Sequence, residues 1–107
     1  MNLKKYEAVF ILEIRKVEDE GKSFTEEITG LIEKNGGTMD LSVPMGRKQF
    51  AREINGSKAG VYWNYVFSVD PDKISVIKNK FQLDERILRS MIINYERPEK
   101  AIEGKNI

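Results

Sequence analysis

The sequence contains no cysteine and no histidine among its 107 residues. Without cysteine the chain can form neither a disulfide framework nor an iron–sulfur cluster, which excludes an electron-transfer ferredoxin. Without histidine it lacks the commonest metal ligand in proteins and the commonest general base. It also has no Walker-type loop and no G-x-G-x-x-G run, the usual nucleotide-binding motifs. We therefore expect no metal site and no cofactor.

Long apolar runs and a strong net charge are missing as well. No stretch approaches the ~20 apolar residues that a membrane span needs. The N-terminal run "MNLKKYEAVFILEI" carries Glu7 and Glu13 and lacks a cleavage site of small residues, so we do not interpret it as a signal peptide. The formal charge is +1, from 18 basic and 17 acidic side chains. This balance predicts that any basic patch is local, and the lack of a signal peptide and of a membrane span makes the cytoplasm the expected compartment.

Hydrophobic periodicity predicts the order of the elements. Apolar residues alternate with period two where strands are expected and recur at helical spacing where helices are expected. Gly36-Gly37 ends the first helix, and Asp70-Pro71-Asp72 is a typical helix start. Asn55-Gly56 predicts a hairpin turn. The predicted strands are 5–14, 38–54, 60–67 and 87–96, and the predicted helices are 17–35 and a second one that begins at Asp70 and includes Ile74, Ile77 and Phe81.

The order strand, helix, strand, strand, helix, strand predicts an α+β fold of the ferredoxin-like βαββαβ class. Its four-stranded antiparallel sheet has both helices on one face, because right-handed crossovers place them there. The first and third strands are central in this topology. We expect residues 1–98 to form a single domain and residues 99–107 to form a flexible C-terminal tail, because no period continues beyond Pro98.

The stretch "GVYWNYVF", residues 60–67, is apolar on both sides of its alternation. Trp63, Tyr65 and Phe67 are expected to pack under the helices, but nothing in so short a chain is left to cover the opposite face. We therefore expect a protein partner there. Met91 and Ile93 of the last strand share this face if its register turns them away from the core, and Leu88 and Ile92 are the alternative set. The predicted partner-protein face comprises Val9, Ile11, Tyr62, Asn64, Val66, Met91 and Ile93.

Basic side chains gather in "GRKQFARE", residues 46–53. Arg47, Lys48 and Arg52 have two interpretations that the residues alone do not separate. They contact phosphates of a nucleic acid, or they guard an edge strand against aggregation. Basic residues at strand ends extend the candidate RNA-binding set, which comprises Lys4, Lys5, Arg47, Lys48, Arg52, Arg86 and Arg89.

Two other functions, base stacking on the sheet and hydrolysis by its carboxylates, agree less well with the residues. RNA-recognition modules share this topology and stack bases on sheet aromatics. However, the third strand has no Gly or Ala between its aromatics, and Tyr62 and Trp63 point to opposite faces. Core packing with a protein partner is therefore favoured over base stacking. A histidine-free hydrolase would need an acidic cleft, whereas helix ends and solvent account for the carboxylates, so we predict no enzyme.

Four stretches together resemble the bacterial small-subunit ribosomal protein S-six family: "KKYEAVFIL", "GRKQFAREI", "AGVYWNYVF" and "DERILRSMIINYERP". The resemblance runs from Lys4 to about Pro98. It implies a domain without catalytic activity that binds the central domain of the small-subunit rRNA together with ribosomal protein S-eighteen. The basic pair of the family falls on Arg47 and Lys48, and a basic position of its last strand falls on Arg89. The alternative is a free-standing ferredoxin-like regulatory domain that binds a small ligand and self-associates through its open face.

Overall fold

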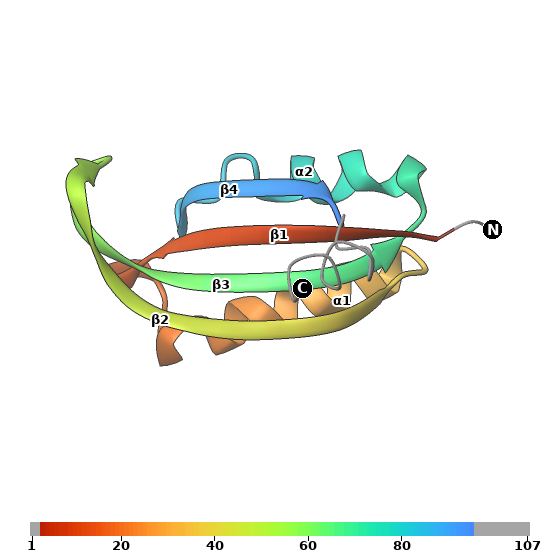
Figure 1. Cartoon of the computed structure of the whole chain (residues 1–107), viewed down its shortest axis with the longest axis horizontal. Helices are drawn as coiled ribbons and strands as arrows, with labels where there is room; N and C mark the ends of the chain where they lie inside the picture. Colours follow the sequence, from red (N-terminus) through yellow and green to blue (C-terminus); the bar gives the residue numbers. More distant parts are fainter. Residues whose placement is uncertain (1–2, 96–107) are drawn as a thin grey trace, which may run out of the picture.

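The computed structural model describes residues 3–95 of the chain (Figure 1). The predicted domain limit at residue 98 and the predicted tail 99–107 lie outside the described residues. Three short 3-10 turns, η1 (Ile14–Lys16), η2 (Asp19–Gly21) and η3 (Pro71–Lys73), precede the two helices. The longer elements are β1 (Lys4–Glu13), α1 (Lys22–Lys34), β2 (Thr38–Ile54), β3 (Ser57–Val69), α2 (Ile74–Phe81) and β4 (Ile87–Asn94).

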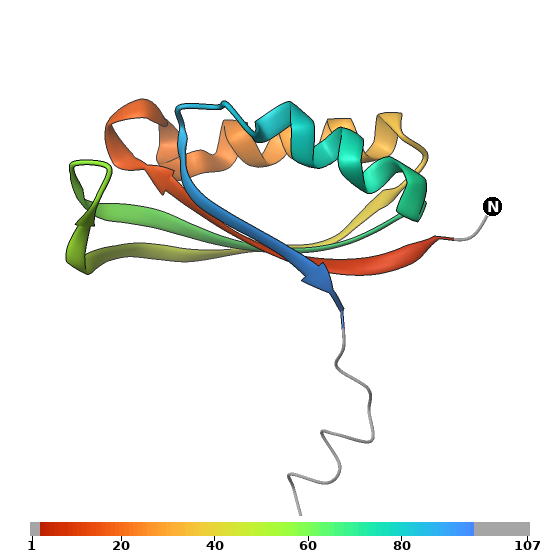
Figure 2. The ribbon, with the colours of Figure 1, turned by 90° about the horizontal axis from the view of Figure 1, so that it is seen from above.

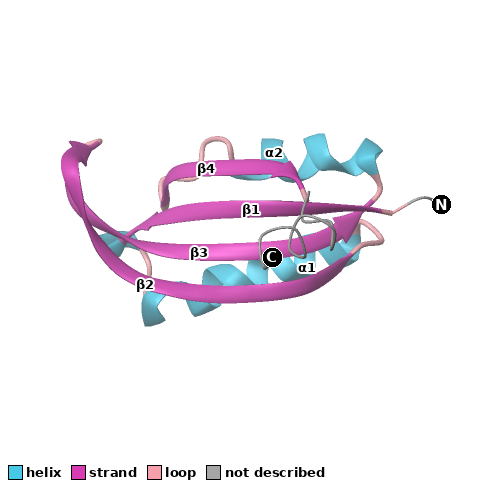
Figure 3. Ribbon diagram, viewed as in Figure 1, coloured by secondary structure: helices cyan, strands magenta, loops and turns pink. Residues whose placement is uncertain are grey.

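The four strands form one antiparallel sheet in the order β2-β3-β1-β4, so β1 and β3 are central as predicted. Figure 2 shows α1 and α2 on the same side of the sheet, with no layer on the other side among the described residues. The secondary-structure colouring of Figure 3 shows how far the β2–β3 hairpin extends beyond the helices. The ferredoxin-like βαββαβ fold is confirmed. No helix of the described residues is long and apolar enough to cross a membrane.

The face assignment of the third strand is confirmed by burial. Trp63, Tyr65 and Phe67 are at most 6% exposed and lie on the helix side. The Trp63 indole donates a hydrogen bond to the backbone carbonyl of Glu20 at 2.9 Å, and the Tyr65 hydroxyl lies 2.9 Å from the Thr25 hydroxyl. These bonds satisfy the polar atoms of the Trp63 and Tyr65 side chains. The core therefore joins β3 to the start of α1 through both apolar and polar contacts.

The predicted start of the first helix at residue 17 is wrong, because the chain first makes the turns η1 and η2 and enters α1 only at Lys22. Gly21 explains the delay. Its φ is +94°, and a Cβ at this position would lie 2.6 Å from the Trp63 indole nitrogen and 2.8 Å from a methyl of Leu12. Only glycine fits both the left-handed backbone and this close approach. At the second helix the Asp70 carboxylate accepts from the Asp72 amide at 2.9 Å, as expected for a cap, but Asp70 caps the 3-10 turn η3 and α2 itself begins at Ile74.

The loop between α2 and β4 is tied to α1 by Arg86. Its guanidinium donates to the Asp84 carboxylate at 2.6 Å and to the Glu27 carboxylate at 2.5 Å, and it lies 5.0 Å from the centre of the Phe24 ring. These hydrogen bonds lower the pKa of Asp84 and of Glu27 and raise the pKa of Arg86. Arg86 was predicted to bind RNA. Its donors are instead engaged by two carboxylates of the same chain, which gives it a structural role.

Replacing Arg86 tests this role. The Asp84 side chain is 16% exposed and would lose its cation, so Arg86→Gln is expected to lower the free energy of unfolding at pH 7 by about 1–3 kcal/mol. The lowered carboxyl pKa values mean that the ion pairs stabilise the fold above about pH 4 and lose this contribution as the pH falls through those values. Urea unfolding across pH 2–7 measures the difference.

Arg86→Lys is the control, because it keeps the charge and is expected to lose less stability than Arg86→Gln. A glutamine variant as stable as the parent at pH 7 would contradict the structural role and return Arg86 to the candidate RNA-binding residues.

Candidate functional site

The sheet face opposite the helices, called the open face below, carries every residue that was predicted to meet a partner protein. Cross-strand pairs establish the alignment: Val9 lies opposite Asn64 on one side and Met91 on the other, and Ile11 lies opposite Tyr62 and Arg89. Met91 is 58% exposed and Ile93 50% exposed, whereas Ile92 packs against the core. The sequence did not determine the register of β4. In the structure this register places Met91 and Ile93 on the open face.

The apolar part of this face is not confined to the predicted residues. Leu41 and Val43 of β2 lie opposite Val66 and Asn64, and they are 56% and 44% exposed. Val66 itself is only 6% exposed, so it offers a partner little surface. Leu41 and Val43 were not among the predicted residues, although their period-two spacing in the sequence was a usable signal. The apolar half of the open face is defined here as Val9, Leu41, Val43, Met91 and Ile93.

A pair of aromatic rings occupies the other half of the open face, toward the β2–β3 hairpin. The Phe50 and Tyr62 rings have centroids 6.3 Å apart and planes inclined at 55°. The Lys48 ammonium lies 5.7 Å from the centre of the Tyr62 ring. Phe50 also covers Gly60, where a Cβ would come within 2.8 Å of its ring. Phe50 was not predicted as a site residue, because its role depends on the pairing of β2 with β3.

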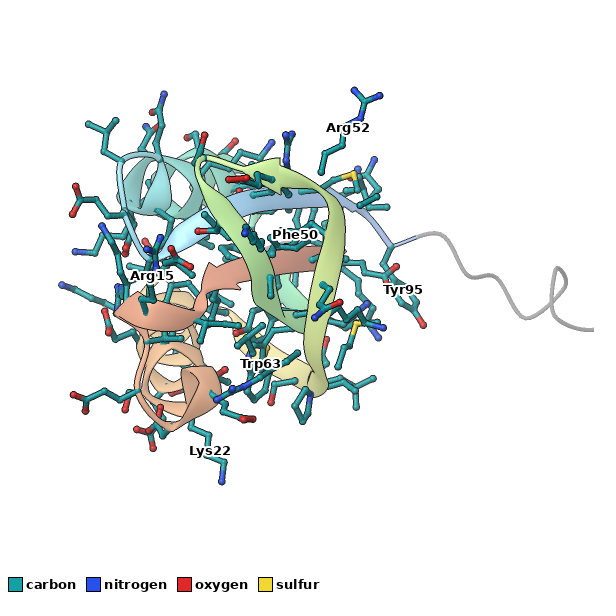
Figure 4. All side chains as sticks on the ribbon, turned by 90° about the vertical axis from the view of Figure 1, so that its left-hand side faces the viewer. Arg15, Lys22, Phe50, Arg52, Trp63 and Tyr95 are labelled. Atoms are coloured by element: carbon teal, nitrogen blue, oxygen red, sulfur yellow. The ribbon has the colours of Figure 1, made fainter. Side chains whose placement is uncertain are left out.

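Arg47 and Lys48 project to opposite sides of the sheet, although they were predicted to act as one pair. Arg47 lies opposite the core residue Val61, and its guanidinium is 3.3 Å from the Glu20 carboxylate on the helix side. Lys48 lies opposite Gly60 and reaches the open face. Figure 4 shows Arg52 pointing into solvent on the same side of the molecule as Tyr95, with Lys22 on the far side. The structure therefore brings Lys48 and Arg52, but not Arg47, to the open face.

The remaining candidate cations are distributed over both ends of the sheet. Lys5 lies on the open face, where its ammonium is 4.0 Å from the Asp40 carboxylate and 5.5 Å from the centre of the Tyr95 ring. Lys4 lies opposite Val69 and so faces the other way. Arg89 lines a shallow depression of about 270 Å³ on the open face together with Val9, Ile11, Ser90 and Met91. The cations near the ring pair are thus Lys48, Arg52 and Arg89.

The side chains of the open face are of the kinds that bind other macromolecules. No group of three acidic, cysteine or histidine side chains that could hold a metal ion occurs within residues 3–95. The described open face presents rings, aliphatic side chains and cations. Such a surface suits a macromolecule that brings both apolar groups and negative charge.

Comparison with known proteins agrees with this description. Residues 5–94 match the family described as "Ribosomal protein S6". The "Small ribosomal subunit protein bS6" of Helicobacter pylori (strain G27) is 34% identical over 95% of this chain and 71% of its own length. That of Helicobacter hepaticus is 35% identical over 88% of this chain and 69% of its own length.

A solved structure supports the fold independently. The crystal structure of 30S ribosomal protein S6 from Thermotoga maritima superposes with a TM-score of 0.83, covers 99% of this chain and all of its own, and is 24% identical in sequence. The residues that match the family span β1 to β4 and include the whole open face. The chain belongs to the ribosomal protein S6 family, a family of structural ribosomal proteins and not of enzymes.

Proposed function

We propose that this chain is a structural component of the small ribosomal subunit that binds the central domain of the small-subunit rRNA together with ribosomal protein S-eighteen, and that it is ribosome-associated in the cell. Membership of the family supports the ribosomal role. The observation that carries the proposal is the open face itself, which has exposed apolar side chains on one half and rings with cations on the other. Each half suits a different partner.

The protein partner is proposed to cover the apolar half. Leu41, Met91 and Ile93 are each at least 50% exposed, and side chains of this size are seldom grouped on the surface of a lone monomer. Specific protein interfaces bury ~800 Å² on each partner and have an apolar centre with a polar rim. Lys5 and Asp40 lie at the edge of the apolar half and would form part of such a rim.

The RNA is proposed to contact the cations at the hairpin and at the strand ends, namely Lys48, Arg52 and Arg89, with Lys4, Lys5 and Arg47 as outlying contacts. Arginine and lysine side chains neutralise phosphates and release counterions, so each contact makes binding more sensitive to salt. Arg86 is left out of this set because two carboxylates already hold its guanidinium.

The free-standing regulatory domain remains the alternative. Sedimentation of a cell lysate through sucrose at magnesium concentrations that keep subunits apart distinguishes the two functions. The proposed function predicts that the chain travels with the small subunit, and its consistent presence at the top of the gradient would contradict the proposal.

The involvement of the hairpin cations in RNA binding is tested by the salt dependence of the affinity. Lys48→Gln combined with Arg52→Gln is expected to reduce the slope of log K against log salt by about 0.9 for each phosphate that is no longer neutralised. The measurement is filter binding of a transcript of the rRNA central domain in the presence of S-eighteen. Lys22→Gln, which removes one positive charge on the helix side (Figure 4), is the control and should leave the slope unchanged. Equal slopes for the parent, the double variant and the Lys22 variant would mean that the hairpin cations do not contact the RNA and serve only to prevent aggregation at the sheet edge.

The role of the apolar half in protein binding is tested by making it polar. Met91→Ser and Ile93→Ser are each expected to weaken binding of S-eighteen about 5-fold or more, while thermal unfolding changes little because both side chains are at least half exposed. Leu83→Ser is the matched control, since Leu83 is 91% exposed but lies in the loop before β4. Titration calorimetry measures the affinities. If the Leu83 variant loses as much as the other two, the apolar half is not the contact surface.

A further inference from the structure

The ring pair of Phe50 and Tyr62 lies among cations, although the sequence places Tyr62 with the partner-protein residues. We propose that the ring pair is a stacking platform for an unpaired base of an RNA strand, and that Lys48, Arg52 and Arg89 hold the phosphates of that strand. The inference rests on the proposed function in taking RNA as the ligand. It divides the open face, leaving the apolar half alone to the protein partner.

The two rings differ from the other aromatic residues of the sheet in what surrounds them. Trp63, Tyr65 and Phe67 are at most 6% exposed and pack against the helices. Phe50 and Tyr62 are half-buried on the open face, with ring centroids 6.3 Å apart. Phe50 is held in place because its ring covers Gly60, where no side chain competes for the space. Because Phe50 is already fixed and still partly exposed, a base can stack on it without the entropic cost of first ordering its side chain.

The charges near the ring pair favour a polyanion. Lys48 reaches the Tyr62 ring, and Arg89 lies in the same cross-strand row as Tyr62 with Ile11 between them. Arg52 follows Phe50 by two residues on β2 and extends outward into solvent (Figure 4). Two strand spacings separate Tyr62 from Arg89, which is about 10 Å. A single strand that lies across the sheet would therefore meet a ring and a cation in succession.

The carboxylates of the open face lie away from the ring pair or are buried. Asp40 accepts from Ser68 at 2.8 Å and pairs with Lys5, and Glu7 accepts from Asn64 at 3.1 Å, both toward the Lys5 end of the sheet. Glu13 is 4% exposed and engaged by Ser57 and Arg15. Among the described residues near the rings, Lys48, Arg52 and Arg89 outnumber the one exposed carboxylate of the hairpin end, Glu53 beside Arg52, while the other half is apolar with its charges paired.

The position of Lys48 over the Tyr62 ring is compatible with this use. A cation–π contact at an exposed ring is weaker than the stacking of a base on the same ring. The lysine side chain is long and its residue is exposed, so a base can take its place while the ammonium moves to the adjacent phosphate. The ring and the cation then bind adjoining parts of one nucleotide.

The test uses the full-length chain and a ten-residue oligoadenylate RNA with one central 2-aminopurine, whose fluorescence falls when the base stacks. Tyr62→Leu is expected to weaken binding of this RNA about 10-fold and to abolish most of the quenching, with the salt slope unchanged because every phosphate keeps its cation. Lys48→Gln is expected to lower the slope by about 0.7, as for single strands, and to leave the quenching of the bound RNA intact.

Tyr62→Phe is the matched control and should behave as the parent, since it keeps the ring. Phe50→Leu provides a second ring deletion if the Tyr62 variant fails to fold. Loss of quenching in a folded ring-deletion variant supports the platform. Equal affinity and quenching in parent and ring-deletion variants would overturn it, as would no binding of the oligonucleotide by the parent, or a loss confined to S-eighteen binding.

Parallel binding of the rRNA central-domain transcript separates this inference from the proposed function. If the parent chain with S-eighteen does not bind the transcript, the proposed function fails. If it binds the transcript and the ring-deletion variants bind both RNAs equally well, only the stacking platform fails.

Discussion

A β-sheet has two faces, and the described part of this chain has helices for only one of them. Residues of β1 and β3 that alternate toward α1 and α2 form the aromatic and aliphatic core. The residues between them point the other way and meet no second layer within residues 3–95. Because hydrophobic side chains occur on both faces of β1 and β3, one set is buried by folding and the other remains available for association.

The open face is organised by the register of the sheet. Cross-strand pairs bring residues of four strands into rows, so that side chains far apart in sequence form one surface. Rows near Lys5 are apolar with paired charges, and rows near the hairpin hold the Phe50 and Tyr62 rings with cations around them. One small domain therefore presents an apolar half and a half with rings and cations side by side, and in the proposed function these two halves bind the protein partner and the RNA.

Local signals made most of the fold predictable from the sequence. The hairpin turn at Asn55-Gly56 and the cap at Asp70 depend on residues next to them in the chain, and both are found where predicted, although the Asp70 cap leads into the 3-10 turn η3 before α2. The start of α1 depends on a distant residue, because Gly21 makes its turn against the Trp63 indole. The register of β4 was equally inaccessible, since both of its faces are apolar and its pairing with β1 shifts between Ile11 and Leu12.

The candidate site was predicted as a set of residues but not as an arrangement. Alternation along a strand already separates Arg47 from Lys48, yet only the tertiary structure shows that Glu20 holds Arg47 on the helix side. The engagement of Arg86 by Glu27 likewise joins segments that are far apart in the chain. Phe50 gains its role only through its position over Gly60. Residue type indicates which side chains can bind RNA, and three-dimensional contacts decide which are free to do so.

Chemical labelling tests the claim that the open face is covered by other macromolecules. The chain contains no cysteine, so a single Met91→Cys variant carries one reactive thiol on the open face, and Leu83→Cys carries one away from it. Both thiols should react rapidly with a maleimide in the isolated protein. In assembled small subunits, the account predicts that labelling slows at least about 10-fold at position 91 and stays fast at position 83. Equally fast labelling at position 91 in the assembled subunit would contradict it.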